Sequence, residues 1–315
     1  MKNLYLSLLF LFGFFTATVH AQTRYLHEVF TDAQISVSAN VIYGANTTVL
    51  AFPTLIKQPL IMDVYRPASD TETNRPVVLY LHTGNFLPFH NPANGDPGFN
   101  GSCGGTIRDS AVVYACRRLA RMGYVAAAVD YRLGWNPLAP NDVDRRNGII
   151  NAAYRGIQDT RTAIRYFKKT VKEGGNSWGI DTTKIVLFGQ GTGGYLSMNA
   201  IFLDNYLKIP FASGGKFVWD HDMNPNTPPV PMIVESINGN INGTSVGKHP
   251  VTGDTLCHIN HPGYTSNFQL AVNLGGACAD TAWIDPGQQP LLSLHVPYDS
   301  NAPYDEDIVN APGTN

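Results

Sequence analysis

The sequence predicts an α/β fold built on a doubly wound, mostly parallel sheet, and three observations lead to that prediction. Short apolar runs typical of buried strands alternate with longer segments of helical periodicity, as in successive βαβ units. At 315 residues the chain is long enough for one large domain. Its 43% apolar and 15% charged residues are the opposite of the balance in disordered chains. We therefore expect a folded domain with a sizeable core.

Residues 1–21 have the composition of a signal peptide. Lys2 gives the positive start, residues 4–15 form an apolar run, and Val19 and Ala21 put small residues before the cleavage point. The run is too short to span a bilayer, which takes about 20 apolar residues. The sequence therefore predicts an exported protein, periplasmic or extracellular, with no membrane span and a mature domain over residues 22–315.

The first half of the domain is expected to supply three strands and two helices. Runs of apolar residues predict buried or half-buried strands at residues 60–65, 77–81 and 124–129. A helix is predicted over residues 109–122, with Asp109 at its start. A second helix is predicted over residues 152–173, because apolar residues recur there at helical spacing.

The second half continues the alternation, with a helix predicted at residues 195–206 and strands at residues 184–188, 268–274 and 290–295. Residues 207–267 interrupt it and are rich in Asn, Gly, Pro and Thr. An insert of this length between a helix and a strand is typical of a functional cap over the strand ends where ligands bind. A surface excursion held by a disulfide is the alternative.

The four cysteines become candidates for disulfides once export is assumed. Three pairings are possible. The sequential one, Cys103–Cys116 with Cys257–Cys278, closes the shortest loops, and we take it as the prediction. A zinc site is disfavoured because no C-x-x-C spacing occurs.

A glycine-rich turn at residues 189–194 joins the strand predicted at 184–188 to the helix that follows it. Such a turn pushes one residue outward on strained backbone, and the next residue presents its N–H at the helix start, where it can stabilise an oxyanion. A dinucleotide-binding fingerprint would need the first strand of a βαβ unit, and this strand comes late in the chain. A phosphate-binding loop is excluded because no Gly-Lys-[Ser/Thr] follows.

Four further motifs precede this turn in the sequence. Residues 62–67 (MDVYRP) form an early strand, residues 82–86 (HTGNF) follow a buried strand, and residues 130–134 (DYRLG) follow another. Residues 156–159 (GIQD) lie in the helix before the turn. In their order and spacing these motifs resemble the α/β-hydrolase superfamily, and its carboxylesterase/lipase branch in particular. The resemblance covers most of residues 58–305. It implies that residues 82–86 match the H-G-G-x-[FW] oxyanion loop of that branch.

The resemblance also implies a serine nucleophile in a G-x-S-x-G turn, and here the sequence departs from it. The matching residues are Gly189 to Gly193, so Gly191 occupies the nucleophile position and has no side chain to attack a carbonyl. Thr192 is one residue late and is expected to point into the helix start, which makes it a poor replacement. By the resemblance, the oxyanion-hole residues are His82, Gly84, Asn85 and Thr192.

Asp299 is the candidate for the acid of the triad. It follows the last predicted strand and resembles the acid of the family's H-x-x-x-D-x-x-x-P segment, although a loop-capping carboxylate is the alternative. This fold orders its triad as nucleophile, acid and histidine, and no histidine follows His295. Only 16 residues follow Asp299, so we expect the C-terminal strand, the histidine loop and the closing helix to be missing and the chain to be incomplete.

Three functions follow, in this order of preference. The first is a secreted carboxylesterase-like protein whose catalysis is impaired, so that a small ester or acylated substrate is bound but hardly turned over. The second is a non-catalytic binding or adhesion protein on the same fold, with a protein or glycan ligand. The third is an active ester hydrolase that uses Thr192, or one restored by serine at position 191.

No cofactor is expected for any of these functions. The spacing Cys257-His258-x-x-His261 could suggest a metal site, but it is not an established ligand pattern, and we expect no metal. The formal charge of −2, without clustered basic residues, argues against a nucleic-acid partner.

Overall fold

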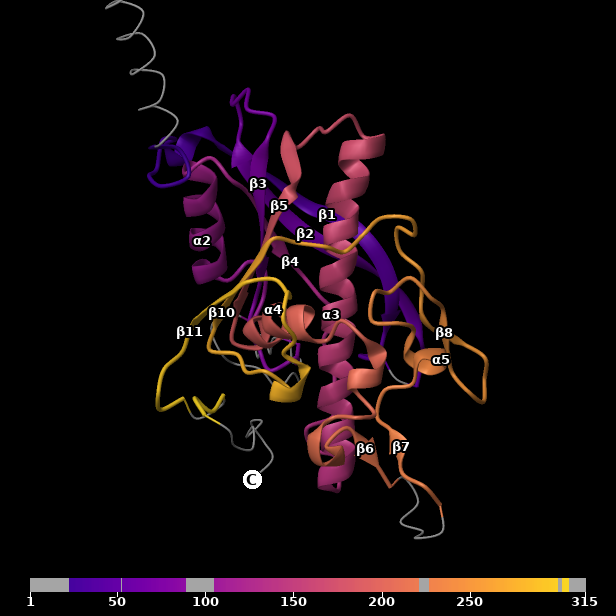
Figure 1. The fold of residues 1–315 in the computed structure, drawn as a ribbon. Coiled ribbons are helices and arrows are strands. Elements are labelled where there is room, and N and C mark those ends of the chain that lie inside the picture. Colours follow the sequence, from indigo (N-terminus) through magenta and orange to yellow (C-terminus); the bar gives the residue numbers. More distant parts are fainter. Residues whose placement is uncertain (1–22, 52, 89–104, 221–226, 300–301, 306–315) are drawn as a thin grey trace, which may run out of the picture.

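Seven strands form the central sheet, in the order β1-β2-β4-β3-β5-β10-β11 (Figure 1). The computed structural model describes residues 23–51, 53–88, 105–220, 227–299 and 302–305. Strand β2 is antiparallel to β1 and to β4, whereas the pairs from β4 across to β11 are parallel. The strands are β1 (Ile35–Thr48), β2 (Ile56–Pro67), β3 (Arg75–Leu81), β4 (Val125–Val129), β5 (Ile180–Gln190), β10 (Leu270–Leu274) and β11 (Leu291–Leu294). The predicted mostly parallel, doubly wound sheet is confirmed.

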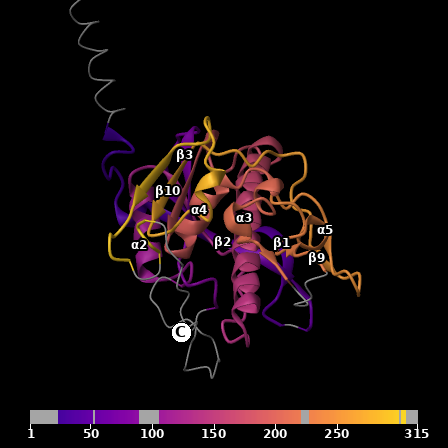
Figure 2. The same ribbon diagram turned by 60° about the horizontal axis from the view of Figure 1, so that its bottom comes forward.

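Helices cover both faces of the sheet. Figure 2 shows α3 and α4 next to each other, with α2 set apart from them. The alternation along β4 separates the two faces: Val125, Ala127 and Val129 join the core under α3 and α4, whereas Ala126 and Ala128 pack with residues of α2. The helices are α2 (Ser110–Arg121), α3 (Asp142–Glu173) and α4 (Thr192–Phe202).

Several element boundaries differ from those predicted. Helix α3 begins at Asp142 rather than at residue 152, because the Asn141 side chain accepts the Asp144 N–H and caps a polar first turn that carries no apolar stripe. Helix α4 begins at Thr192, directly after the glycine turn. Strand β1 was not predicted, because much of its length is partly exposed at the edge of the sheet and its apolar residues do not cluster.

The described residues of the insert, 207–220 and 227–267, pack along α3 and the outer edge of β1. They contain the antiparallel pairs β6–β7 and β8–β9 and the short helix α5. Both polar atoms of the Asn260 side-chain amide bond the backbone of Ala45 at 3.0 Å, as a neighbouring strand would. Gln158 of α3 donates to the carbonyls of Asn238 and Asn240 at 2.9 and 2.8 Å. The bounds are β6 (Val218–Trp219), β7 (Val230–Pro231), α5 (Glu235–Asn238), β8 (Gly247–Lys248) and β9 (Thr255–Cys257).

The predicted Cys257–Cys278 disulfide is wrong, since both residues are free thiols. Cys257 ends β9, which packs on β1 at one edge of the sheet, whereas Cys278 follows β10 near the other edge. Strands lie about 4.8 Å apart, so five strand spacings keep the two thiols much farther apart than a disulfide allows. Cys116, on the buried face of α2, is also a free thiol, and its predicted partner Cys103 lies outside the described residues.

The predicted signal peptide, residues 1–21, also lies outside the described residues. Among the helices that are described, none combines the length and the apolar character needed to cross a membrane.

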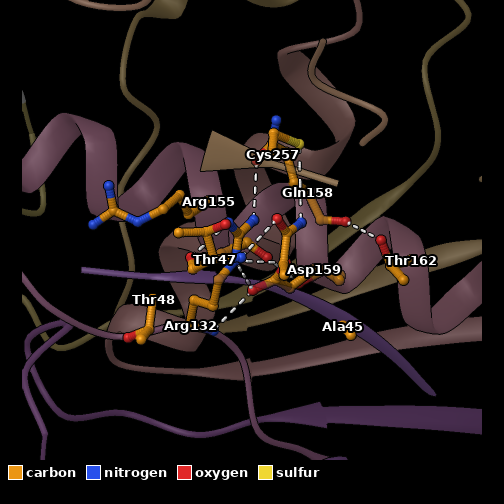
Figure 3. A network of polar contacts seen from close by, with 12 residues as sticks. Ala45, Thr47, Thr48, Arg132, Arg155, Gln158, Asp159, Thr162 and Cys257 are labelled. Carbon is orange, nitrogen blue, oxygen red and sulfur yellow. Dashed lines mark hydrogen bonds and ion pairs between the residues drawn. The ribbon is translucent and has the colours of Figure 1, made fainter. Parts of the chain in front are cut away.

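A buried ion pair joins the segment after β4 to α3. Arg132 and Asp159 are each no more than 1% exposed, and Figure 3 shows them pointing toward each other. The Arg132 Nε lies 2.8 Å from an Asp159 oxygen, and the Arg132 backbone N–H donates to the same carboxylate at 2.8 Å. The guanidinium also donates to the Gln158 side chain and to the carbonyl of Thr47 on β1. One carboxylate therefore fixes both the backbone and the side chain of Arg132.

Replacing Arg132 by methionine is expected to destabilise the fold by about 3–5 kcal/mol, because it leaves the Asp159 carboxylate buried without its cation. Urea unfolding followed by circular dichroism measures the loss. The control is Arg118→Met, which breaks an ion pair with Glu28 at the surface and should change stability little. Equal effects of the two substitutions would contradict the prediction.

Candidate active site

The turn between β5 and α4 has the geometry of a nucleophile elbow. Gly191 is the single residue between the two elements, with φ of +54° and ψ of −118°. The glycines after it allow a close approach. A Cβ on Gly193 would lie 2.8 Å from the carbonyl oxygen of His82, and a Cβ on Gly194 would lie 2.9 Å from the backbone nitrogen of Gly276. Side chains at these positions would hold α4 away from the strand ends, so the glycines are a steric requirement of the turn.

The predicted oxyanion loop follows β3 and lies against this turn. Its backbone folds tightly, with positive φ at Gly84, Asn85 and Phe86 and a hydrogen bond from Leu87 N–H to the Gly84 carbonyl at 2.9 Å. Left-handed backbone at Asn85 and Phe86 is unfavourable in isolation and persists where neighbouring contacts hold it. The structure thus gives this loop a fixed and strained shape.

Those holding contacts come from the segment after β4. The Trp135 indole donates to the Asn85 carbonyl at 2.8 Å, and the Gly134 N–H donates to the Phe86 carbonyl at 2.7 Å. Arg155 of α3 in turn donates to the Gly134 carbonyl at 2.6 Å. Helix α3 therefore supports the loop through one intermediate residue.

Tyr131 joins the loop to the helix start, a role that the sequence did not reveal. Its hydroxyl donates to the His82 carbonyl at 2.7 Å and lies 3.2 Å from the Thr192 hydroxyl. Burial raises the pKa of Tyr131, so the hydroxyl keeps its proton at every ordinary pH. The Thr192 hydroxyl is turned toward this buried tyrosine, and the residue is 8% exposed.

His82 lies within the loop as a supporting residue. Its ring stacks on Tyr131 with centroids 4.5 Å apart, and its Nδ1 lies 2.6 Å from the carbonyl oxygen of Thr83. Its Nε2 lies 3.8 Å from a carboxylate oxygen of Asp130. The imidazole is fully buried, and these contacts fix its orientation.

Asp299 lies in the segment after β11, near the carboxyl end of β10. Its carboxylate accepts the Ala302 N–H at 3.0 Å, a contact of the loop-capping kind. A Cβ on Gly275, the residue after β10, would lie 3.4 Å from its second oxygen. Burial raises the pKa of Tyr195 on α4, and the negative charge of Asp299 adds to that rise. The carboxylate is therefore close to α4, and its part as the acid stays a prediction.

Comparisons with known proteins give one family match and a number of similar solved structures. Residues 62–213 match BD-FAE, an α/β-hydrolase esterase family. No curated protein matches the chain. Similar solved structures include Thermogutta terrifontis esterase 2 phosphorylated by paraoxon (TM-score 0.43, 17% identity, 87% of this chain and 75% of that one), its propionate-bound form (TM-score 0.44, 15% identity, 87% and 76%) and an inhibited esterase B from Lactobacillus rhamnosis (TM-score 0.38, 17% identity, 83% and 55%).

The family match spans β2 to α4. In the structure β2 alone of the seven strands is reversed, and β5 ends in the elbow. Over residues 62–213 the chain matches the α/β-hydrolase superfamily, and its sheet has the fold of that superfamily. The resemblance inferred from the sequence motifs is thereby confirmed at the level of the superfamily.

Thr83 is a second departure from the α/β-hydrolase pattern, and its side chain lies against Gly191, which is the first departure. The loop motif of the esterase branch has glycine at this position, as the sequence H-G-G implies, whereas this chain has His82-Thr83-Gly84. The Thr83 side chain lies against Gly191, where a Cβ would come 2.8 Å from the Thr83 Cβ and would overlap its Oγ1. The departure at position 83 was visible in the sequence, but its contact with Gly191 was not.

The described histidines of the insert do not gather into a metal site. His261 Nε2 lies 2.7 Å from the carbonyl of Tyr43 on β1. Over the described ranges of the chain, no group of three or more His, Cys, Asp and Glu side chains is placed to hold a metal ion.

Replacing Tyr131 by phenylalanine should destabilise the α/β-hydrolase fold by about 1–3 kcal/mol, because the buried His82 carbonyl loses its donor. The free energy of unfolding in urea is the measurement. Tyr114→Phe is the matched control, since that side chain is 60% exposed on α2. A Tyr131→Phe variant as stable as the Tyr114→Phe variant would refute the proposed link between the loop and α4.

Proposed function

We propose that this protein is an exported, carboxylesterase-like α/β-hydrolase whose ester hydrolysis is strongly impaired. The observation that carries the proposal is the elbow, which has the backbone of a nucleophile position but presents glycine at residue 191. Without a side-chain hydroxyl no acyl-enzyme can form at this residue. Removing the nucleophile from an assembled triad lowers turnover on the order of a million-fold, and about a thousandfold acceleration over water survives from binding and the oxyanion hole.

The rest of the site supports binding of a carboxylic ester. The oxyanion loop keeps a fixed shape through Trp135 and Gly134, and Tyr131 ties it to the start of α4. The first N–H groups of a helix are donors suited to a carbonyl oxygen or an oxyanion. In this proposal the donors are the backbone N–H groups of Gly84, Asn85 and Thr192. The ligand class is a small ester or an acylated molecule.

Thr192 is a poor substitute nucleophile in this setting. Its side chain is buried, and its hydroxyl faces the hydroxyl of Tyr131 rather than a base. The pKa of Tyr131 is raised by burial, so a phenolate able to take the threonine proton is absent at neutral pH. This geometry favours an impaired enzyme over an active threonine hydrolase.

The full chain should hydrolyse p-nitrophenyl butyrate at a rate about a million-fold below that of an active serine esterase assayed beside it. It should also form no covalent adduct with paraoxon, as measured by intact-protein mass spectrometry, because residue 191 has no hydroxyl. Rapid hydrolysis that Thr192→Ala abolishes, or a phosphoryl adduct mapped to Thr192, would overturn the proposal.

Export predicts a mature chain that begins at Gln22. When the gene is expressed in a bacterial host, the protein recovered from the periplasm or the medium should lack residues 1–21 by N-terminal sequencing. A chain recovered only from the cytoplasm with Met1 in place would contradict export, and it would leave the proposal about the site unaffected.

A further inference from the structure

Positions 83 and 191 are brought to the same level by the pairing of two parallel strands. Strands β3 and β5 are neighbours, and Leu81 pairs with Gly189. Each chain then continues for two residues, to Thr83 on one side and Gly191 on the other. Because parallel strands advance together, these residues meet directly beyond the sheet, although 108 positions separate them in the sequence.

The side chain of Thr83 takes up the space that a side chain at residue 191 would need. A Cβ at residue 191 would overlap Thr83 Oγ1 and would stand 2.8 Å from Thr83 Cβ, closer than real Cβ atoms come to another carbon. Rotation about χ1 of Thr83 can move its hydroxyl away, but it leaves the Thr83 Cβ where it is. The obstruction is therefore set by the backbone at both positions and not by one rotamer.

We propose that Thr83 is the structural substitute for the missing nucleophile, so that Thr83 and Gly191 form one complementary pair. The Thr83 side chain fills the volume that a serine side chain at residue 191 would need. Its hydroxyl takes no part in bond formation. The inference rests on the proposed function and extends it, because two residues rather than one then keep the site without a nucleophile.

The pair predicts that a side chain at residue 191 destabilises the protein least when position 83 is glycine. Alanine at position 83 removes the hydroxyl and keeps the Cβ, so it should relieve part of the overlap. Glycine removes both. Thr83 itself is not among the residues with positive φ, so alanine is compatible with its backbone.

The experiment measures the thermal unfolding midpoint of Gly191→Ser in three backgrounds, with threonine, alanine or glycine at position 83. A matched control is Gly214→Ser, because Gly214 has φ of +65° and nothing within 4 Å of its would-be Cβ. The control measures the cost of a side chain at positive φ where there is free space, a loss of about 2–4 °C. Because ψ is 11° at Gly214 and −118° at Gly191, the overlap itself is measured by how the loss depends on position 83. In the threonine background we expect Gly191→Ser to lower the midpoint by roughly 5–10 °C, since it adds an overlap to that strain.

In the Thr83→Gly background the loss caused by Gly191→Ser should be smallest, with the Thr83→Ala background in between. This non-additivity is the signature of two residues in contact, and an independent structural role of Thr83 would give additive losses instead. The proposal is overturned if the loss is the same in all three backgrounds, or if Gly191→Ser costs no more than Gly214→Ser.

A variant that fails to fold is also decisive. If Gly191→Ser folds only in the Thr83→Gly background, the pair is supported. If both Gly191→Ser and the smaller Gly191→Ala fail to fold in all three backgrounds, Thr83 is not the obstacle and the proposal fails. A paraoxon adduct on Thr83 of the unaltered chain would also overturn it, because the hydroxyl would then be a nucleophile. Activity of the unaltered chain tests the proposed function, whereas the unfolding series tests the pair, so either can fail alone.

Discussion

The arrangement of the site depends on the buried pair between Arg132 and Asp159. The Asp159 carboxylate binds both the backbone N–H and the guanidinium of Arg132, so the chain leaving β4 has a single position relative to α3. Tyr131, the residue before, is thereby held so that its hydroxyl reaches the His82 carbonyl and the start of α4. The segment then supports the oxyanion loop through Gly134 and Trp135. A charge pair that is costly to bury thus sets the geometry of residues it never touches.

The central strands and the elbow could be predicted from the sequence because their signals are local. Buried parallel strands such as β3 and β4 are continuous apolar runs. The elbow is marked by the close spacing of its glycines, which is uncommon outside tight turns. Strand β1 lacks such a run because it lies at an edge and is partly exposed. The insert is fastened by polar contacts, such as those of Asn260 with Ala45, and hydrophobic periodicity carries no information about them.

The errors in the site predictions share one cause, which is distance along the chain. The Cys257–Cys278 disulfide was inferred from closeness in sequence, yet β9 and β10 lie toward opposite edges of the sheet. The contact of Thr83 with Gly191 and the link from Tyr131 to His82 both join segments far apart in the sequence. Only strand order and register show which side chains of those segments meet.

The overlap at position 191 makes the order of substitutions matter. A chain that first acquires serine at residue 191 passes through a state in which that side chain collides with Thr83, whereas one that first acquires glycine at residue 83 does not. The two substitutions that would give a serine elbow can therefore occur in one order without the overlap and in the other order only through it, although both orders end in the same sequence. With threonine at residue 83, no single substitution can place serine at residue 191 without this overlap.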